Sequence, residues 1–198
     1  NAFYPGVTDQ DVAAWTEQGL IGSFLHVLTL EEANYLQSLA MKSRLQIPII
    51  FGIDAIHGNA NAPDNTVYPT NINLACSFDT LLAYRIARET AKEMRAMNMH
   101  WTFNPNVEVA RDARWGRVGE TYGEDPYLVT LMGVQSVKGY QGDLNSKEDV
   151  LACIKHFVGG SEPINGTNGS PTDLSERTLR EVFFPPFEAG VQAGAMSL

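Results

Sequence analysis

The sequence has little positive charge and no long apolar run. Lysine and arginine number 14 against 23 aspartates and glutamates, which gives a net charge of −9 over 198 residues. Nucleic-acid binding favours a basic surface, so this balance argues against a nucleic-acid partner. No stretch approaches the roughly 20 apolar residues that a membrane-spanning helix needs, so no membrane partner is expected. A protein that handles neutral or cationic ligands fits this charge balance.

Several catalytic signatures are also missing. The sequence has no serine nucleophile elbow, no glycine-rich phosphate loop and no pair of Cys-x-x-Cys motifs. Gly159-Gly160 is too sparse for a dinucleotide fingerprint, so a nucleotide-dependent enzyme is not expected. The two cysteines, Cys76 and Cys153, lie in apolar segments and are predicted to be buried free thiols. Residues 1–5 lack the features of a signal peptide, so we expect a mature or truncated N-terminus.

Apolar patterning predicts strands that alternate with helices along the chain. We expect strands at Gly19–Leu25, Ile47–Ile53, His100–Asn104 and Val150–Phe157, and the beginning of another at Ala195–Leu198. We expect helices at Leu30–Ser43, Thr80–Ala96, Pro126–Gln141 and Ser175–Ala193, and an irregular loop between Gly58 and Thr80.

Helix-end signals refine this pattern. Ser77 or Asp79 is predicted to cap the second helix, and Asp125 to cap the third, with Pro126 at its first position. The last helix is expected to break near Pro185-Pro186, because proline removes backbone donors.

The alternation predicts an α/β fold of parallel strands with helical crossovers. A doubly wound sheet and a partial TIM-type (β/α)₈ barrel both fit, and a complete barrel needs about 250 residues. Both architectures bind ligands at the C-terminal ends of the strands. Charged groups follow three predicted strands, at Gly52–Gly58, Asn104–Gly116 and Lys155-His156, which indicates one shared pocket.

Asp54 follows the second predicted strand. Its carboxylate can accept hydrogen bonds from two neighbouring hydroxyls, as in sugar binding, or it can cap a turn against which His57 packs. A metal site of Asp54, His57 and His26 is a weaker alternative, because nothing supplies the clustered ligands that such a site needs.

Three arginines flank Trp115 in the segment after the third predicted strand. Arginine can bind carboxylates or hydroxyls, and tryptophan offers a flat apolar wall. We expect most of these charges to form an ion-pair lattice, and one arginine to reach ligand. The lattice is predicted to contain Arg111, Asp112, Arg114, Glu120 and Glu124. Glu124 and Asp125 are also expected to serve the start of the next helix.

Lys155 and His156 end the fourth predicted strand. Lysine donates three hydrogen bonds, and histidine can donate one while a neighbour holds its other nitrogen. An adjacent lysine and histidine at the end of a buried strand favour a ligand-binding role over a structural one.

The ordered set of motifs resembles the N-terminal domain of glycoside hydrolase family 3, in its β-glucosidase-like branch. The matching segments are Gly52–Gly58, Tyr68–Thr70, Asn104-Pro105, Arg111-Asp112, Arg114–Arg117, Glu120–Pro126, Lys155–Phe157, Arg177, Leu179–Glu181 and Pro186-Phe187. The resemblance implies a (β/α)₈ barrel whose pocket binds a terminal, non-reducing β-linked sugar. It also implies that Asp54, Arg117, Lys155 and His156 hold the hydroxyls of that sugar.

The same resemblance implies a retaining mechanism, with an aspartate nucleophile in a Ser-Asp-aromatic setting and a glutamate acid/base from a following domain. The sequence contains no Ser-Asp dipeptide, so both catalytic carboxylates are expected outside it. Residues 1–198 are therefore expected to be an incomplete family 3 barrel domain that supplies the sugar-binding part of the pocket. The rest of the parent enzyme would be needed for activity, and the first barrel strand would be missing or shortened.

Substrate and location are also expectations from the resemblance. A β-glucosidase acting on a β-linked oligosaccharide or glucoside is the first interpretation, and β-xylosidase is the second. The branch that acts on N-acetylglucosamine is disfavoured, because the loop from Val158 to Leu174 has no histidine. A non-catalytic sugar-binding protein on the same scaffold is a third interpretation. No metal or organic cofactor is implied, and a secreted or periplasmic location is the expectation for the family.

Overall fold

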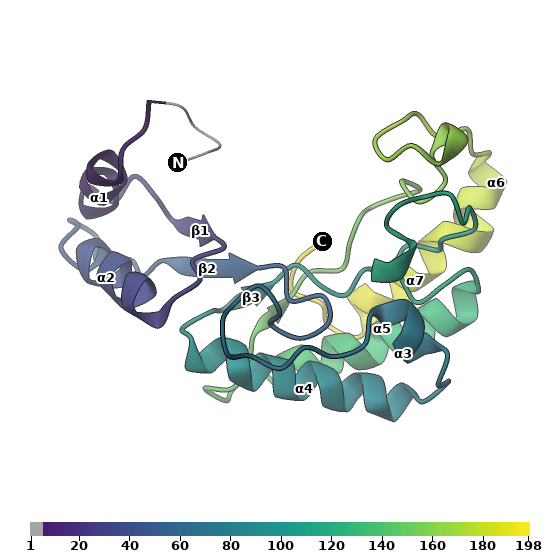
Figure 1. Ribbon diagram of the computed structural model, residues 1–198, viewed down its shortest axis with the longest axis horizontal. Helices are drawn as coiled ribbons and strands as arrows, with labels where there is room; N and C mark the ends of the chain where they lie inside the picture. The colour runs from purple at the N-terminus through teal and green to yellow at the C-terminus, as the bar shows by residue number, and fades with distance from the viewer. Residues whose placement is uncertain (1–5) are drawn as a thin grey trace.

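Four parallel strands form one sheet in the computed structural model, which describes residues 6–198. The strands are β1 (Ser23–Leu25), β2 (Ile50–Ile53), β3 (Trp101–Thr102) and β4 (Leu151–Ala152), and their order in the sheet follows the sequence. The elements form an open arc with the strands at its centre (Figure 1). Parallel strands joined by helical crossovers are thus confirmed. The expectation of a processed N-terminus concerns residues 1–5, which lie outside the described range.

Helices occupy most of the connections between strands. The longer ones are α1 (Asp9–Glu17), α2 (Leu30–Ala40), α4 (Thr80–Ala96), α5 (Pro126–Gln141) and α7 (Phe184–Gln192), and the shorter ones are α3 (Asn71–Ala75) and α6 (Glu176–Thr178). Single 3₁₀ turns lie at Val118–Glu120 and Ile164–Gly166. The sequence did not predict α1 or α3, and α3 lies within the segment that was expected to be an irregular loop.

Helix starts follow the predicted capping chemistry. The side chain of Asp79 accepts a hydrogen bond from the Leu82 amide at 2.9 Å, so Asp79 rather than Ser77 caps α4. Asp125 accepts from the Leu128 amide at 2.7 Å, with Pro126 in the first turn of α5. Both caps satisfy amides that an isolated helix end would leave without partners.

All four strands are shorter than predicted, and the third and fourth are reduced to two residues each. Beyond Thr102 and Ala152 the ladder is reduced to isolated bridges, from Asn106 to Lys155 and from Cys153 to Ser197. One reason is local, because the Asn104 side chain accepts a hydrogen bond from the Asn106 amide at 3.1 Å and so competes with ladder pairing. The bridge to Ser197 confirms that another parallel segment begins at the end of the chain.

The last helical segment does not break at its prolines. Pro185 and Pro186 lie in the first turn of α7, and the irregularity is a π-helical stretch over Leu179–Phe183 just before them. Within that stretch the Phe184 amide bonds to the Leu179 carbonyl, one residue further back than in an α-helix. Because prolines have no amide hydrogen, the preceding carbonyls lose their usual partners and the turn widens.

The two faces of the sheet differ sharply in burial. Ile53, Thr102 and Ala152, which are paired across β2, β3 and β4 and so share one face, are fully buried. The helices α4 and α5 lie together along one side of the sheet (Figure 1). On the opposite face Leu25 is 58% exposed. Gly52 belongs to that open face, where a Cβ atom would come within 2.7 Å of the Phe103 ring. The aromatic ring therefore fills the space above β2.

The cysteine prediction is half right. Both thiols are free, and Cys153 is buried, but Cys76 is exposed. Cys76 ends the unpredicted helix α3, which turns it away from the apolar core. Within residues 6–198, no helix has the length and apolar character needed to cross a bilayer.

Candidate active site

Asp54 and Lys155 form an ion pair at the C-terminal edge of the sheet. Asp54 follows β2, Lys155 follows β4, and the lysine Nζ lies 2.6 Å from Asp54 Oδ1. The Lys155 side chain is 11% exposed and that of Asp54 is 31% exposed, so the pair is only partly open to solvent. Parallel strands bring these residues together although 101 positions separate them in the sequence.

His26 contacts the other oxygen of the same carboxylate. It follows β1, and its Nε2 lies 3.0 Å from Asp54 Oδ2. His57 does not join them, because its Nδ1 lies 3.1 Å from the Tyr68 carbonyl oxygen. In the part of the chain that the structure describes, no three His, Cys, Asp or Glu side chains gather as metal ligands would.

A second cluster surrounds His156. Its Nε2 lies 3.1 Å from Nη2 of Arg117, and its Nδ1 lies 2.8 Å from Oε2 of Glu108. Arg117 also donates two hydrogen bonds to Glu120, at 2.8 and 2.7 Å. The guanidinium is therefore held in a fixed plane beside the imidazole ring.

In these clusters, basic and acidic side chains favour each other's charged forms. Burial alone would raise the pKa of Asp54, but hydrogen bonds and charge from Lys155 and His26 outweigh it, and the pKa is lowered. Burial also opposes ionisation of Glu120, but the Arg117 hydrogen bonds lower its pKa. The Glu120 carboxylate in turn raises the pKa of Arg117. At neutral pH Asp54 is therefore a carboxylate that only accepts hydrogen bonds.

The other charges near Trp115 form separate pairs instead of one lattice. Arg114 bonds Asp112 at 2.7 Å, and Arg111 pairs with Glu162 in the loop after β4 at 3.0 Å. Glu124 makes no ion pair within residues 6–198, contrary to the prediction. The buried indole of Trp115 donates to Asn168 Oδ1 at 3.0 Å. These contacts fasten the loop after β3 to the loop after β4.

A cleft of about 590 Å³ adjoins the two clusters. Asp54, Lys155 and His156 form its polar wall, and Arg117 reaches that wall through His156. Apolar side chains complete the lining: Leu25, Phe103, Cys153, Ile154, Phe157 and Leu198. A hollow with a few convergent polar groups and apolar walls is typical of a small-molecule site.

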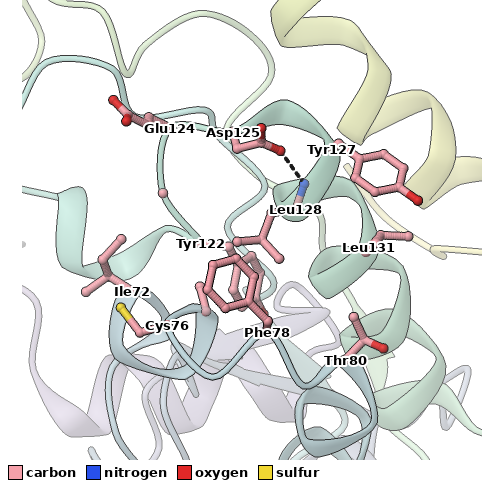
Figure 2. Close-up of a pocket in the computed structure, with 12 residues that line it drawn as sticks. Ile72, Cys76, Phe78, Thr80, Tyr122, Glu124, Asp125, Tyr127, Leu128 and Leu131 are labelled. Carbon is pink, nitrogen blue, oxygen red and sulfur yellow. Dashed lines mark hydrogen bonds between the residues drawn. The ribbon is translucent and has the colours of Figure 1, made fainter.

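A second hollow of about 690 Å³ lies between the end of α3 and the start of α5 (Figure 2). Phe78, Tyr122 and Tyr127 contribute to its wall, and Asp125 is committed to its helix cap there. It shares no lining residue with the cleft beside Asp54. Asp54, Lys155 and His156 therefore line the 590 Å³ cleft and not this hollow.

Comparison with known proteins decides the family. Residues 6–198 match the glycosyl hydrolase family 3 N terminal domain. The chain belongs to this family. The four parallel strands are accordingly part of the (β/α)₈ barrel of the family 3 N-terminal domain, which confirms the predicted fold class.

Curated family 3 relatives cover most of this chain. A β-xylosidase of Formosa agariphila is 42% identical over 189 residues, which are 90% of this chain and 26% of the relative. A periplasmic β-glucosidase of Salmonella typhimurium is 33% identical over 181 residues, which are 90% of this chain and 23% of the relative. The chain thus spans about a quarter of the length of these relatives.

A solved family 3 structure is also similar. The β-glucosidase of Listeria innocua in complex with isofagomine superimposes with a TM-score of 0.86 and 35% identity, over 96% of this chain and 26% of that one. Other structures of the Listeria enzyme hold glucose or, in a mutant, laminaribiose. The shared barrel segment is therefore established at the level of both sequence and fold.

The structure brings all four predicted sugar-binding residues to one edge of the sheet. Asp54 pairs with Lys155, and Arg117 pairs with His156, the neighbour of Lys155. Sequence reasoning missed Glu108 and considered His26 only as a weak metal ligand. His26 could have been found, because it follows a predicted strand as the other site residues do.

Proposed function

We propose that the chain is part of a retaining, exo-acting β-glucosidase that hydrolyses terminal non-reducing β-D-glucosyl residues. In this proposal residues 1–198 belong to an incomplete barrel domain and supply the sugar-binding part of the pocket. The observation that carries the proposal is the Asp54–Lys155 pair, with its 2.6 Å contact, beside the Arg117–His156 pair at the C-terminal edge of a family 3 sheet.

The polar wall is suited to a neutral sugar. An ionised Asp54 can accept from two neighbouring hydroxyls, while Lys155 and Arg117 can only donate. Because both oxygens of Asp54 already have partners, the carboxylate is oriented before ligand arrives. Fixed donors and acceptors lower the ordering cost of binding. The apolar side chains Phe103 and Phe157 offer surface to the carbon face of a sugar ring.

The chemical step requires two carboxyl groups about 5–5.5 Å apart, one as nucleophile and one as acid and then base. We assign neither to this chain: Asp54 is committed to Lys155 and His26, and the sequence has no Ser-Asp dipeptide, the setting that the family resemblance implies for the nucleophile. The proposal therefore expects both catalytic groups in the rest of a longer protein, and no turnover by the 198-residue chain alone.

A β-xylosidase is the second candidate. It is favoured by the 42% identity to the Formosa agariphila enzyme, which exceeds the 33% identity to the Salmonella typhimurium β-glucosidase. None of the contacts at Asp54 or Lys155 distinguishes glucose from xylose, because both sugars present neighbouring ring hydroxyls. A secreted or periplasmic location is part of the proposal and is supported by the periplasmic designation of the Salmonella relative.

The test is hydrolysis of aryl β-glucosides and aryl β-xylosides by the full-length protein. Lys155→Ala should lower kcat/KM about 10- to 100-fold, because a hydrogen bond involving a charged, partly buried group is lost. Lys147→Ala is the matched control, since Lys147 is exposed and is not among the residues that line the cleft. A higher kcat/KM on the xyloside would replace the glucosidase assignment, and a wild-type rate for Lys155→Ala would remove Lys155 from the site.

A further inference from the structure

Glu108 is a buried carboxylate directly behind the sugar-binding wall. It is 2% exposed, and its only side-chain partner within residues 6–198 is Nδ1 of His156, at 2.8 Å from Oε2. Burying an ionisable group costs free energy unless a partner compensates it. The contact with His156 therefore explains why Glu108 can be buried.

Backbone pairing between two segments brings Glu108 and His156 together. The Val107 amide donates to the Lys155 carbonyl at 2.9 Å, and the Lys155 amide donates to the Pro105 carbonyl at 3.1 Å. This pairing sets Glu108 beside His156 on the neighbouring segment. Gly160 leaves room for the carboxylate, because a Cβ atom there would lie 3.1 Å from Glu108 Oε1.

The hydrogen-bond partners of His156 determine which ring nitrogen carries the proton. Arginine has only donors, so Nε2 of His156 must accept from Arg117. The proton of the neutral ring is then on Nδ1, which donates to Glu108. A protonated Glu108 would place the ring proton on Nε2, where it would face a guanidinium donor. The two neighbours thus specify one tautomer together.

We propose that Glu108 is a positioning residue, which holds His156 in the Nδ1–H tautomer so that Nε2 accepts a hydrogen bond from Arg117 and orients its guanidinium at the sugar-binding wall. The inference rests on the proposed glycosidase function. It gives the wall a defined set of donors and acceptors: Asp54 accepts from sugar hydroxyls, while Lys155 and Arg117 donate to them. Each ring hydroxyl can both donate and accept, so this mixed set can pair with several neighbouring hydroxyls at once.

The experiment uses the full-length protein labelled with ¹⁵N-histidine. The wild-type spectrum should show His156 as the Nδ1–H tautomer, with its signals assigned by their loss in His156→Gln. Glu108→Gln keeps the shape of the side chain but can present an amide donor to Nδ1. We expect a mixture of tautomers in this variant, and a fall in kcat/KM of about 10-fold or more for the preferred aryl glycoside.

Glu162→Gln is the matched control, since it makes the same change in a partly buried glutamate that pairs with Arg111 rather than His156. It should leave both the His156 tautomer and the rate unchanged. An Nε2–H tautomer in the wild type overturns the proposal, even if Glu108→Gln does not fold. Wild-type activity and an unchanged tautomer in Glu108→Gln also overturn it. Failure of the wild type to hydrolyse any glycoside overturns the proposed function instead, and the wild-type tautomer still decides the role of Glu108.

Discussion

Acidification should destabilise the barrel segment through His100, which lies just before β3. Nδ1 of its ring accepts a hydrogen bond from the Phe51 amide in β2 at 3.2 Å. The ring also stacks on that of Phe51, with centroids 5.8 Å apart. Burial, and then the nearby charge of Arg95, lower the pKa of His100 from 6.5 to about 4. The folded protein thus prefers the neutral ring.

The sign of the effect follows from proton binding. Between pH 6.5 and about 4 the unfolded chain holds a proton on this histidine that the folded chain does not. The contribution of His100 is therefore fully present above pH 6.5 and is lost as the pH falls towards 4. The difference between the two pKa values corresponds to at most about 3 kcal/mol in the free energy of unfolding.

The assay compares the wild type with His100→Asn by urea unfolding of the full-length protein across this pH range. The asparagine oxygen can accept from the Phe51 amide but does not titrate. At about pH 8 the two proteins differ only by the structural cost of the substitution, which serves as the internal control. Towards pH 4 the wild type should lose up to about 3 kcal/mol more than the variant. Equal losses would refute the reasoning.

Two further predictions concern packing. Gly139→Ala should destabilise the protein by about 1–3 kcal/mol, because the new Cβ would lie 2.4 Å from the Tyr84 carbonyl oxygen between α5 and α4. The melting temperature tests this, with Gly119→Ala as control since nothing lies within 4 Å of a Cβ there. Tyr140→Phe should cost about 1–3 kcal/mol, measured by urea unfolding, because it removes a buried hydroxyl that donates to the Ala55 carbonyl at 3.0 Å. An unchanged midpoint would contradict that role.

Local chemistry explains which elements could be predicted from the sequence. Asp79 and Asp125 predict where α4 and α5 begin. Each side chain accepts a hydrogen bond from the amide three residues later, and this local contact depends on no distant part of the chain. Helix α3 was missed, since its five residues lie in a long connection and no side chain caps its start. The extent of β4 was overestimated because apolar character predicts burial but not how far a ladder extends.

In the candidate site, too, some residues could be predicted from the sequence and others could not. Asp54, Lys155 and His156 could be selected as candidates because each lies at the end of a strand that is recognisable by its apolar run. Glu108 could not, since it lies between Val107 and Val109, and a polar residue that alternates with apolar ones usually faces solvent. Its burial depends on the pairing of two segments that are far apart in the sequence. Partners across strands follow from strand order and register, which a single sequence does not specify.

Strand order has a consequence for how the protein is made. Each strand of the sheet lies beside the strand that precedes it in the chain, so β1, β2 and β3 can pair as they emerge during synthesis. The contact between Asp54 and Lys155 spans 101 residues and requires β4. His156 is also made only at that stage. A nascent chain can therefore hold three of the four described strands while the polar wall of its cleft has yet to assemble.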